Sequence, residues 1–182
     1  MSIGKLEGRV VVITGGASGI GKACALRFAE EGADIVIADL QAERLDAALT
    51  EIQRGTNGRA VGVPTNVTDE ESVEALAERA MAEFGQIDVL VAAAGISHAQ
   101  YESGKKHSST GEFSGKLLDL PLAHWNQVLA VNLTGVMLSN RAVARRMIAN
   151  GRPGAIVNIA SSAAKIPLVG AGDYSVSKAG VA

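Results

Sequence analysis

Short apolar runs alternate with longer amphipathic patterns along this chain. The apolar runs cover residues 10–13, 34–39, 60–63 and 87–93, and a fifth run follows at 155–160. Such runs, rich in Val and Ile, are typical of strands that are covered on both faces. Helical spacing is expected over 20–31, 41–54, 69–84 and 121–150, and again from about residue 173. The alternation predicts right-handed βαβ units and an α/β fold, with a doubly wound parallel sheet between two layers of helices.

Two local features follow from the same pattern. Ile20 and Cys24 fall on the expected apolar side of the first helix, so Cys24 is predicted to be a buried small hydrophobe. Thr68 precedes a run of acidic residues and is expected to cap the helix that begins at Asp69.

A polar segment rich in Gly and Ser interrupts the alternation over residues 95–118. We expect a long loop there, because neither the apolar runs typical of strands nor the helical spacing of apolar residues continues through it. The cluster of Lys105, Lys106 and His107 is expected to be solvated, and a contact with substrate or a partner is the lesser alternative.

Composition narrows the classes of protein to which this chain can belong. The chain has 182 residues, of which 47% are hydrophobic and 20% charged, which suits one globular domain. The net charge of −2 gives no support for a nucleic-acid-binding surface, and the single cysteine excludes an internal disulfide. There is no hydrophobic signal segment and no apolar run of membrane-spanning length, so we expect no membrane partner and a cytoplasmic location.

A glycine turn follows the first apolar run. Gly15, Gly19 and Gly21 have the spacing G-x-x-x-G-x-G, and the predicted helix begins after Ser18. Missing Cβ atoms allow a tight turn and a close approach of a phosphate, which the positive end of the helix dipole attracts. Glycines alone are a weak indication, and a turn that binds nothing is the alternative. The order strand, glycines, helix favours a nucleotide site.

An acid ends the second apolar run. Asp39 lies eighteen positions beyond Gly21, where a dinucleotide-binding fold places the carboxylate that accepts hydrogen bonds from the adenosine ribose. It would also repel a 2′-phosphate, which favours NAD over NADP. A solvated strand-end carboxylate is the alternative. Asn66 and Val67, after the third run, lie where such a fold holds the adenine ring.

A second set of polar residues comes late in the chain. Tyr174 and Lys178 are four positions apart and share one face of a helix. An ammonium beside a phenol favours the phenolate, which makes tyrosine a usable general acid or base. Ser161 follows the fifth run, at the sheet edge where ligands bind in open α/β sheets. Tyr-x-x-x-Lys by itself usually marks an exposed helix face.

These motifs together resemble the short-chain dehydrogenase/reductase family. The residues that carry the resemblance are Thr14-Gly-Gly-Ala-Ser-Gly-Ile-Gly21, Asp39, Ala93-Ala94-Gly95, Asn132 in Val-Asn-Leu-Thr-Gly, Ser161 thirteen positions before Tyr174, and Tyr174-Ser-Val-Ser-Lys178. The resemblance runs from about Leu6 to the last residue. It implies a single Rossmann domain over 1–182 with strand order 3-2-1-4-5.

The resemblance also implies roles. Tyr174 would pass a proton to or from the substrate oxygen while hydride moves at the nicotinamide, and Lys178 would hold the nicotinamide ribose. Ser161 would hydrogen-bond the substrate oxygen. Asn132 would hold a water of a proton relay through a local break in the long helix, or would simply be a polar residue satisfied inside that helix. The implied cofactor contacts are Gly15, Ser18, Gly19, Ile20, Gly21, Asp39, Asn66, Val67, Ala93, Ala94, Gly95, Tyr174 and Lys178; no metal is implied.

The chain departs from the family at several positions. Ala93 replaces an asparagine that steadies the cofactor loop, Asn66 replaces an aspartate, and Lys165 stands where glycine is common. The family continues beyond this chain with further strands, so we expect the fifth strand to be an exposed apolar edge and the sequence to be either a fragment or a truncated form. An intact form is expected to be a homodimer or homotetramer.

Two functions therefore stay open. The first is an NAD-dependent oxidoreductase that acts on a secondary alcohol or its ketone. The second is a nucleotide-binding remnant without turnover, because the substrate-side elements of the family are absent from the sequence.

Overall fold

The computed structural model describes residues 4–54, 58–97, 117–166, 168 and 170–182. Lys105, Lys106, His107 and most of the expected loop lie outside the described residues. The chain divides into two compact units, the first formed by Met1–Ala94 with Val136–Ile159 and the second by Gly95–Gly135 with Ala160–Ala182.

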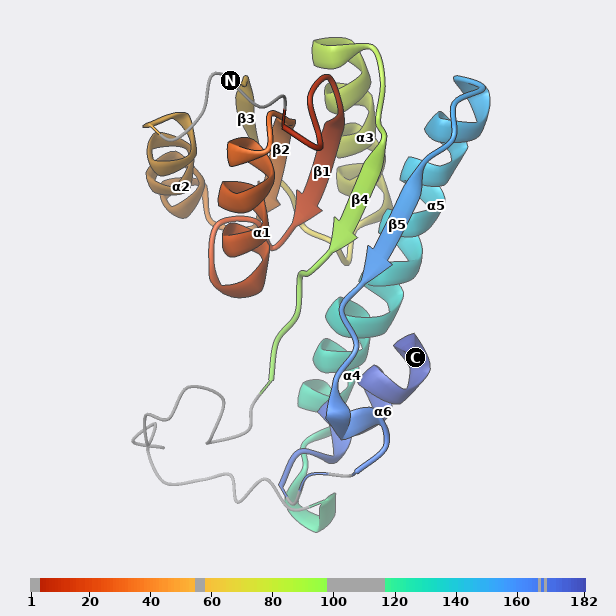
Figure 1. Ribbon diagram of the computed structural model, residues 1–182. Helices are drawn as coiled ribbons and strands as arrows, with labels where there is room; N and C mark the ends of the chain where they lie inside the picture. The colour runs from red at the N-terminus through yellow and green to blue at the C-terminus, as the bar shows by residue number, and fades with distance from the viewer. Residues whose placement is uncertain (1–3, 55–57, 98–116, 167, 169) are drawn as a thin grey trace. The chain divides into compact units, whose positions relative to one another are not determined.

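The first unit holds a five-stranded parallel sheet of order β3-β2-β1-β4-β5 (Figure 1). The strands are β1 (Val10–Thr14), β2 (Asp34–Asp39), β3 (Ala60–Pro64), β4 (Val89–Ala92) and β5 (Ala155–Asn158). Each neighbouring pair is in parallel register, for example Val11 opposite Ile35 and Val89. The strand order predicted from the resemblance is confirmed.

Helices cover both faces of this sheet. They are α1 (Gly19–Glu30), α2 (Ala42–Arg54), α3 (Glu70–Phe84) and α5 (Gly135–Ala149). Figure 1 shows α1 and α2 on one face and α3 on the other. This layering explains why the strands lack polar alternation, because both of their faces are buried.

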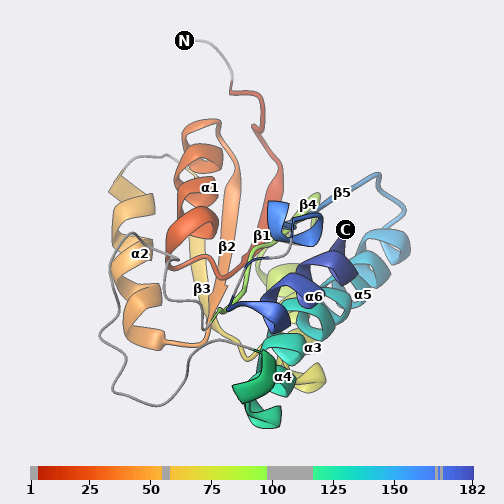
Figure 2. The same ribbon diagram turned by 90° about the horizontal axis from the view of Figure 1, so that it is seen from below.

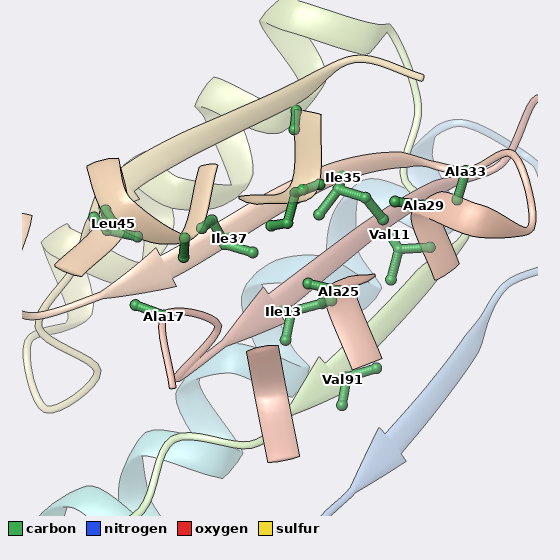
Figure 3. Packing of buried hydrophobic residues seen from close by; sticks show 13 residues of the cluster. Val11, Ile13, Ala17, Ala25, Ala29, Ala33, Ile35, Ile37, Leu45 and Val91 are labelled. Carbon is green, nitrogen blue, oxygen red and sulfur yellow. The ribbon is translucent and has the colours of Figure 1, made fainter. Parts of the chain in front are cut away.

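The core between β1, β2 and the first two helices is aliphatic. Figure 3 shows Val11 and Ile13 of β1 and Ile35 and Ile37 of β2 in one cluster, with Leu45 of α2 near Ile37. All five side chains are at most 2% exposed. The alternate positions Val10, Val12 and Val36 are buried as well, so both sides of the central strands contribute to packing.

The predicted buried face of α1 was wrong at Ile20 and only partly right at Cys24. Its buried residues are Gly21, Ala25 and Ala29, whereas Ile20 is 61% exposed and Cys24 is only half-buried. Cys24, Leu26 and Phe28 are partly buried and pack against the core beside these small residues.

The predicted cap of α3 was displaced by one residue. Asp69 is the N-cap, and its side chain accepts a hydrogen bond of 3.0 Å from the Glu71 N–H. The Thr68 hydroxyl instead donates to the Asn66 side-chain oxygen at 2.8 Å. An aspartate at this position also adds negative charge at the positive end of the helix.

β5 is an edge strand, as predicted. Within the described part of the chain it pairs with β4, and all four of its residues are exposed, including Ile156 and Val157.

The second unit consists of short helical pieces, seen from below in Figure 2. They are η1 (Leu117–Asp119), α4 (Leu122–Leu129), the π-helical turn η2 (Ala130–Thr134), η3 (Ser162–Ala164) and α6 (Gly172–Val181). Helix α6 packs against α4, η2 and η3. The helix expected over 121–150 is therefore interrupted at Asn132, as the resemblance implied.

Candidate active site

The glycine turn after β1 depends on missing side chains. A Cβ on Gly21 would lie 2.2 Å from the carbonyl oxygen of Gly15, and a Cβ on Gly15 would lie 2.8 Å from the backbone nitrogen of Ala94. Gly15 and Gly19 also have positive φ angles of 66° and 52°. Only glycine satisfies both the contacts and the conformation, so the turn can close against the segment after β4.

The start of α1 suits an anion. The side chain of the N-cap residue Ser18 makes no capping hydrogen bond, and the helical ladder begins with the Lys22 N–H donating to the Ser18 carbonyl at 3.0 Å. The N–H groups of the first turn are thus not used by the helix itself. A Cβ on Gly19 would meet nothing within 4 Å, so there is open space beside these donors. These residues fit a phosphate group.

Asp39 ends β2 beside this turn. One of its carboxylate oxygens accepts from the Ala17 N–H and the other from the Gln41 N–H, both at 3.4 Å. These bonds are long, and the carboxylate is half-buried. It is therefore held at the strand end with capacity left to accept hydrogen bonds from a ligand.

The segment after β4 is held by the backbone and by Thr14. The Ala93 N–H donates to the Thr14 carbonyl at 3.2 Å, and the Ala94 N–H donates to the Thr14 hydroxyl at 3.3 Å. The path of the chain is thus fixed without a polar side chain at position 93. Thr14 is 1% exposed, and its position at the start of the glycine motif did not by itself predict this role.

Asn66 and Val67 follow β3. The Asn66 side-chain oxygen accepts from both the N–H and the hydroxyl of Thr68, so the carbonyl end of its amide is committed to this turn. Asn66 is exposed and Val67 is 8% exposed. Asn66 thus has only its amide nitrogen left as a polar group for a ligand.

In the second unit, Asn132 is a fully buried junction. Its side-chain oxygen accepts from the Ile96 N–H at 2.8 Å, and its amide nitrogen donates to the Ile96 carbonyl at 2.9 Å and to the Ser177 hydroxyl at 3.1 Å. The Ser177 hydroxyl in turn donates to the Tyr174 carbonyl at 2.7 Å. The side chain of Asn132 thereby joins the segment after Gly95 to α6, and its polar atoms are satisfied within the protein.

Lys178 and Tyr174 lie together on α6. The Lys178 Nζ is 5.7 Å from the centre of the Tyr174 ring, and Lys178 is only 5% exposed. A Cβ on Gly95 would lie 3.7 Å from this Nζ and 3.4 Å from the Asn132 oxygen. The ammonium, the phenol and the amide therefore converge on one small region of the second unit, beside a residue that has no side chain.

Ser161 begins the short helix η3, which packs against α6. Its Oγ accepts a hydrogen bond of 3.1 Å from the Ala163 N–H. The backbone thus occupies an acceptor position of the hydroxyl, which leaves its proton to be donated to another group.

Sequence reasoning missed two polar residues of these units. Ser177 links Asn132 to α6, the helix that carries Tyr174. Its position between Tyr174 and Lys178 was the feature of the sequence that could have indicated a role in the site. Asp88 is 2% exposed and accepts from the Val10 N–H at 2.9 Å and from Arg9 at 2.9 Å. Burial alone would raise the pKa of Asp88, but these hydrogen bonds and the charges of Arg9 and Arg152 outweigh it and lower the pKa below its usual value.

Other clusters carry no comparable chemistry. A hollow on α3 is lined by residues 69–71, 74, 75 and 78, and its glutamates 70, 74 and 78 form ion pairs with arginines 141, 145 and 146 of α5. These pairs join two helices and do not indicate a substrate site. Among the described residues there is no group of three His, Cys, Asp or Glu that could hold a metal, and no helix long and apolar enough to cross a membrane.

Comparisons with known proteins bear on the family and the fold of the chain. A family model described as short chain dehydrogenase matches residues 9–182. The chain is 44% identical over 174 residues to cis-4-hydroxycyclohexanecarboxylate dehydrogenase of Sinomonas cyclohexanicum, covering 96% of this chain and 63% of that protein. It is 39% identical over 177 residues to D-threitol dehydrogenase of Mycolicibacterium smegmatis, covering 97% and 62%.

A solved structure matches over a similar share of this chain. The crystal structure of NAD⁺-bound xylitol dehydrogenase has a TM-score of 0.85 and 32% identity, covering 97% of this chain and 62% of that one. The chain thus spans a little under two thirds of the length of these relatives.

Proposed function

Because the chain belongs to the short-chain dehydrogenase/reductase family, we propose that it is an NAD-dependent oxidoreductase acting on a secondary alcohol or the corresponding ketone. The observation that carries the proposal is the pairing on α6, where the buried Lys178 ammonium lies 5.7 Å from the Tyr174 ring. An ammonium held close to a phenol on the same helix is an arrangement suited to general acid–base catalysis.

Proton transfer is assigned to the second unit. When bound, the nicotinamide supplies or accepts the hydride. The Tyr174 hydroxyl gives a proton to the substrate oxygen, or takes it, and Lys178 stabilises the phenolate that remains. Ser161 donates its hydroxyl proton to the same oxygen, since the bond that the hydroxyl accepts from the Ala163 N–H does not use that proton.

Asn132 acts by position. Its side chain is committed to Ile96 and Ser177, so we assign it to holding α6 and the π-helical turn in place. A water held at this turn as part of a proton relay, which the resemblance implies, stays a prediction.

Binding of the adenosine half and the pyrophosphate is assigned to the first unit. Gly15, Ser18, Gly19, Ile20 and Gly21 would hold the pyrophosphate at the start of α1. Asp39 would accept hydrogen bonds from the adenosine ribose and repel a 2′-phosphate, which supports NAD over NADP. Ala93 and Ala94 would line the site through their backbone, and Gly95, the first residue of the second unit, is proposed as a further backbone contact of the cofactor. Val67 would contact the adenine ring, and Asn66 would reach that ring only through its amide nitrogen.

The substrate is a small alcohol or ketone. Two relatives supply starting points, since they are named for cis-4-hydroxycyclohexanecarboxylate and for D-threitol. A cytoplasmic location and a homodimer or homotetramer of the whole protein stay predictions.

The test separates an enzyme from a nucleotide-binding remnant. The purified chain is titrated with NADH and with NADPH by nicotinamide fluorescence, and then assayed with NAD and a panel of secondary alcohols that includes the two named above. Saturable NADH binding with turnover supports the proposal. Binding without turnover of any alcohol supports the remnant, and absence of nucleotide binding contradicts both.

A further inference from the structure

The turn that begins at Ser161 presents a cation next to an apolar side chain. Lys165 is exposed, and the neighbouring Ile166 is 70% exposed. Resting on the function proposed above, we propose that these two residues select an anionic substrate: an alcohol or ketone whose apolar carbon skeleton carries a carboxylate. Ile166 would contact the skeleton and Lys165 the carboxylate.

Backbone hydrogen bonds keep this pair close to Ser161. The Ala164 N–H donates to the Ser161 carbonyl at 3.1 Å, and the N–H groups of Lys165 and Ile166 both donate to the Ser162 carbonyl, at 3.0 and 2.9 Å. A 3₁₀ turn advances by about 2 Å per residue, so the Lys165 backbone lies within roughly 8 Å of Ser161 along the turn. A substrate whose oxygen is bound by Ser161 can therefore place a carboxylate several bonds away within reach of the lysine ammonium.

Charge in the second unit favours this use of Lys165. Its other described lysine, Lys178, is 5% exposed, and its Nζ lies 5.7 Å from the centre of the Tyr174 ring. Asp173 is also buried, with 3% of its surface exposed. In the part of the chain that the structure describes, Lys165 forms no ion pair. Lys165 is thus an exposed positive charge on the segment that holds the candidate substrate-binding serine.

Exposed Ile166 adds a preference for carbon. A lysine alone would attract any anion, including a polar sugar acid or free phosphate. An isoleucine at 70% exposure beside it gains about 25 cal/mol for each Å² of apolar surface that a ligand covers. The pair thereby favours an alicyclic or branched hydroxy acid over a polyol.

The experiment compares an acid with its uncharged partner. A hydroxycyclohexanecarboxylate and the corresponding carboxamide are assayed with NAD on the parent chain and on Lys165→Gln, Lys165→Arg and Lys165→Glu. An exposed ion pair contributes about 0.2–1 kcal/mol, so Lys165→Gln should lower kcat/KM for the acid by a factor of roughly 1.4 to 5, and Lys165→Glu should lower it further. Lys165→Arg should retain the preference, and the carboxamide should respond little to any of the three.

Two readouts keep this proposal separate from the proposed function. Binding of acid and carboxamide is also measured by ligand-observed NMR with NADH present, which needs no turnover. Preferential binding of the acid that disappears in Lys165→Gln supports the selection even where no alcohol is oxidised, in which case only the oxidoreductase proposal fails. Equal binding of acid and carboxamide, or equal loss of both in Lys165→Gln, overturns the selection while leaving the oxidoreductase proposal intact.

Discussion

Substituting alanine for Gly21 tests the nucleotide turn directly. The new Cβ would lie 2.2 Å from the Gly15 carbonyl oxygen and 2.8 Å from the Gly15 carbonyl carbon. Both partners are backbone atoms, so no side chain can rotate away, and the turn itself must move. We expect the N–H groups at the start of α1 to lose their alignment toward a bound pyrophosphate.

The expected magnitudes follow from this contact. Overpacking costs about 1–3 kcal/mol, and replacing glycine by alanine inside a helix returns about 1 kcal/mol, so the free energy of unfolding should fall by only about 1 kcal/mol. Each lost hydrogen bond to a charged phosphate costs about 1.5–3 kcal/mol. NADH affinity should therefore fall about tenfold or more, a much larger effect than the change in stability.

Gly85→Ala supplies the matched control. Gly85 has a φ of 74° and open space around its missing Cβ, and it ends α3 away from the glycine turn in the sequence. Alanine in this left-handed conformation costs about 1–2 kcal/mol, so this variant should lose comparable stability. Urea unfolding and NADH titration of both variants give the comparison. A folded Gly21→Ala variant that binds NADH as tightly as Gly85→Ala would refute the assignment of the turn.

Three further outcomes are expected. Asp39→Ala should raise the ratio of NADPH to NADH affinity about tenfold by removing one negative charge, whereas a parent chain that already prefers NADPH would show that Asp39 is misassigned. Asp88→Asn should lower the free energy of unfolding by about 1–2 kcal/mol at neutral pH, because the half-exposed Arg9 and Arg152 lose a charged partner. Because the folded-state pKa of Asp88 is lowered, its contribution is present above about pH 4 and is lost as the pH falls through the folded pKa, so urea unfolding of the variant should depend less on pH in that acidic range. Asn132→Ala should lower the free energy of unfolding by about 2–3 kcal/mol, since three buried hydrogen bonds are lost, and a thermal melt unchanged from the parent would contradict its role as a junction.

The layers and strand order of the first unit could be predicted from the sequence. Runs such as 10–13 and 34–39 lack polar alternation because both faces of those strands are buried, and this pattern is visible without a structure. The interruption at Asn132 was predictable only through the family resemblance. A π-helical turn leaves no periodic trace that distinguishes it from the helices on either side.

The incorrect predictions concern the buried face of α1 and the N-cap of α3, where contacts in the folded chain decide which side chain is used. Helix α1 buries Gly21, Ala25 and Ala29, whereas hydrophobicity alone favoured a face with Ile20 and Cys24. The choice of cap between Thr68 and Asp69 depended on which side chain reached the Glu71 N–H, which spacing does not determine.

The missed residues show a second limit. Asp88 lies inside an apolar run. The hydrogen bonds that compensate for burying its carboxylate come from Arg9 and Val10, which are 79 and 78 positions away in the chain, so no local sequence pattern reveals them. Ser177 similarly bonds to Asn132, 45 positions away.

The central claim is that Tyr174 transfers the proton with the help of Lys178. The most direct test is turnover of Tyr174→Phe with the best alcohol of the panel, beside Val176→Ala, an exposed position on the same helix. General acid–base catalysis contributes about 10²–10⁴-fold, so Tyr174→Phe should lose at least about a hundredfold in kcat while still binding NADH, and Val176→Ala should keep parental turnover. Parental turnover by Tyr174→Phe would contradict the account.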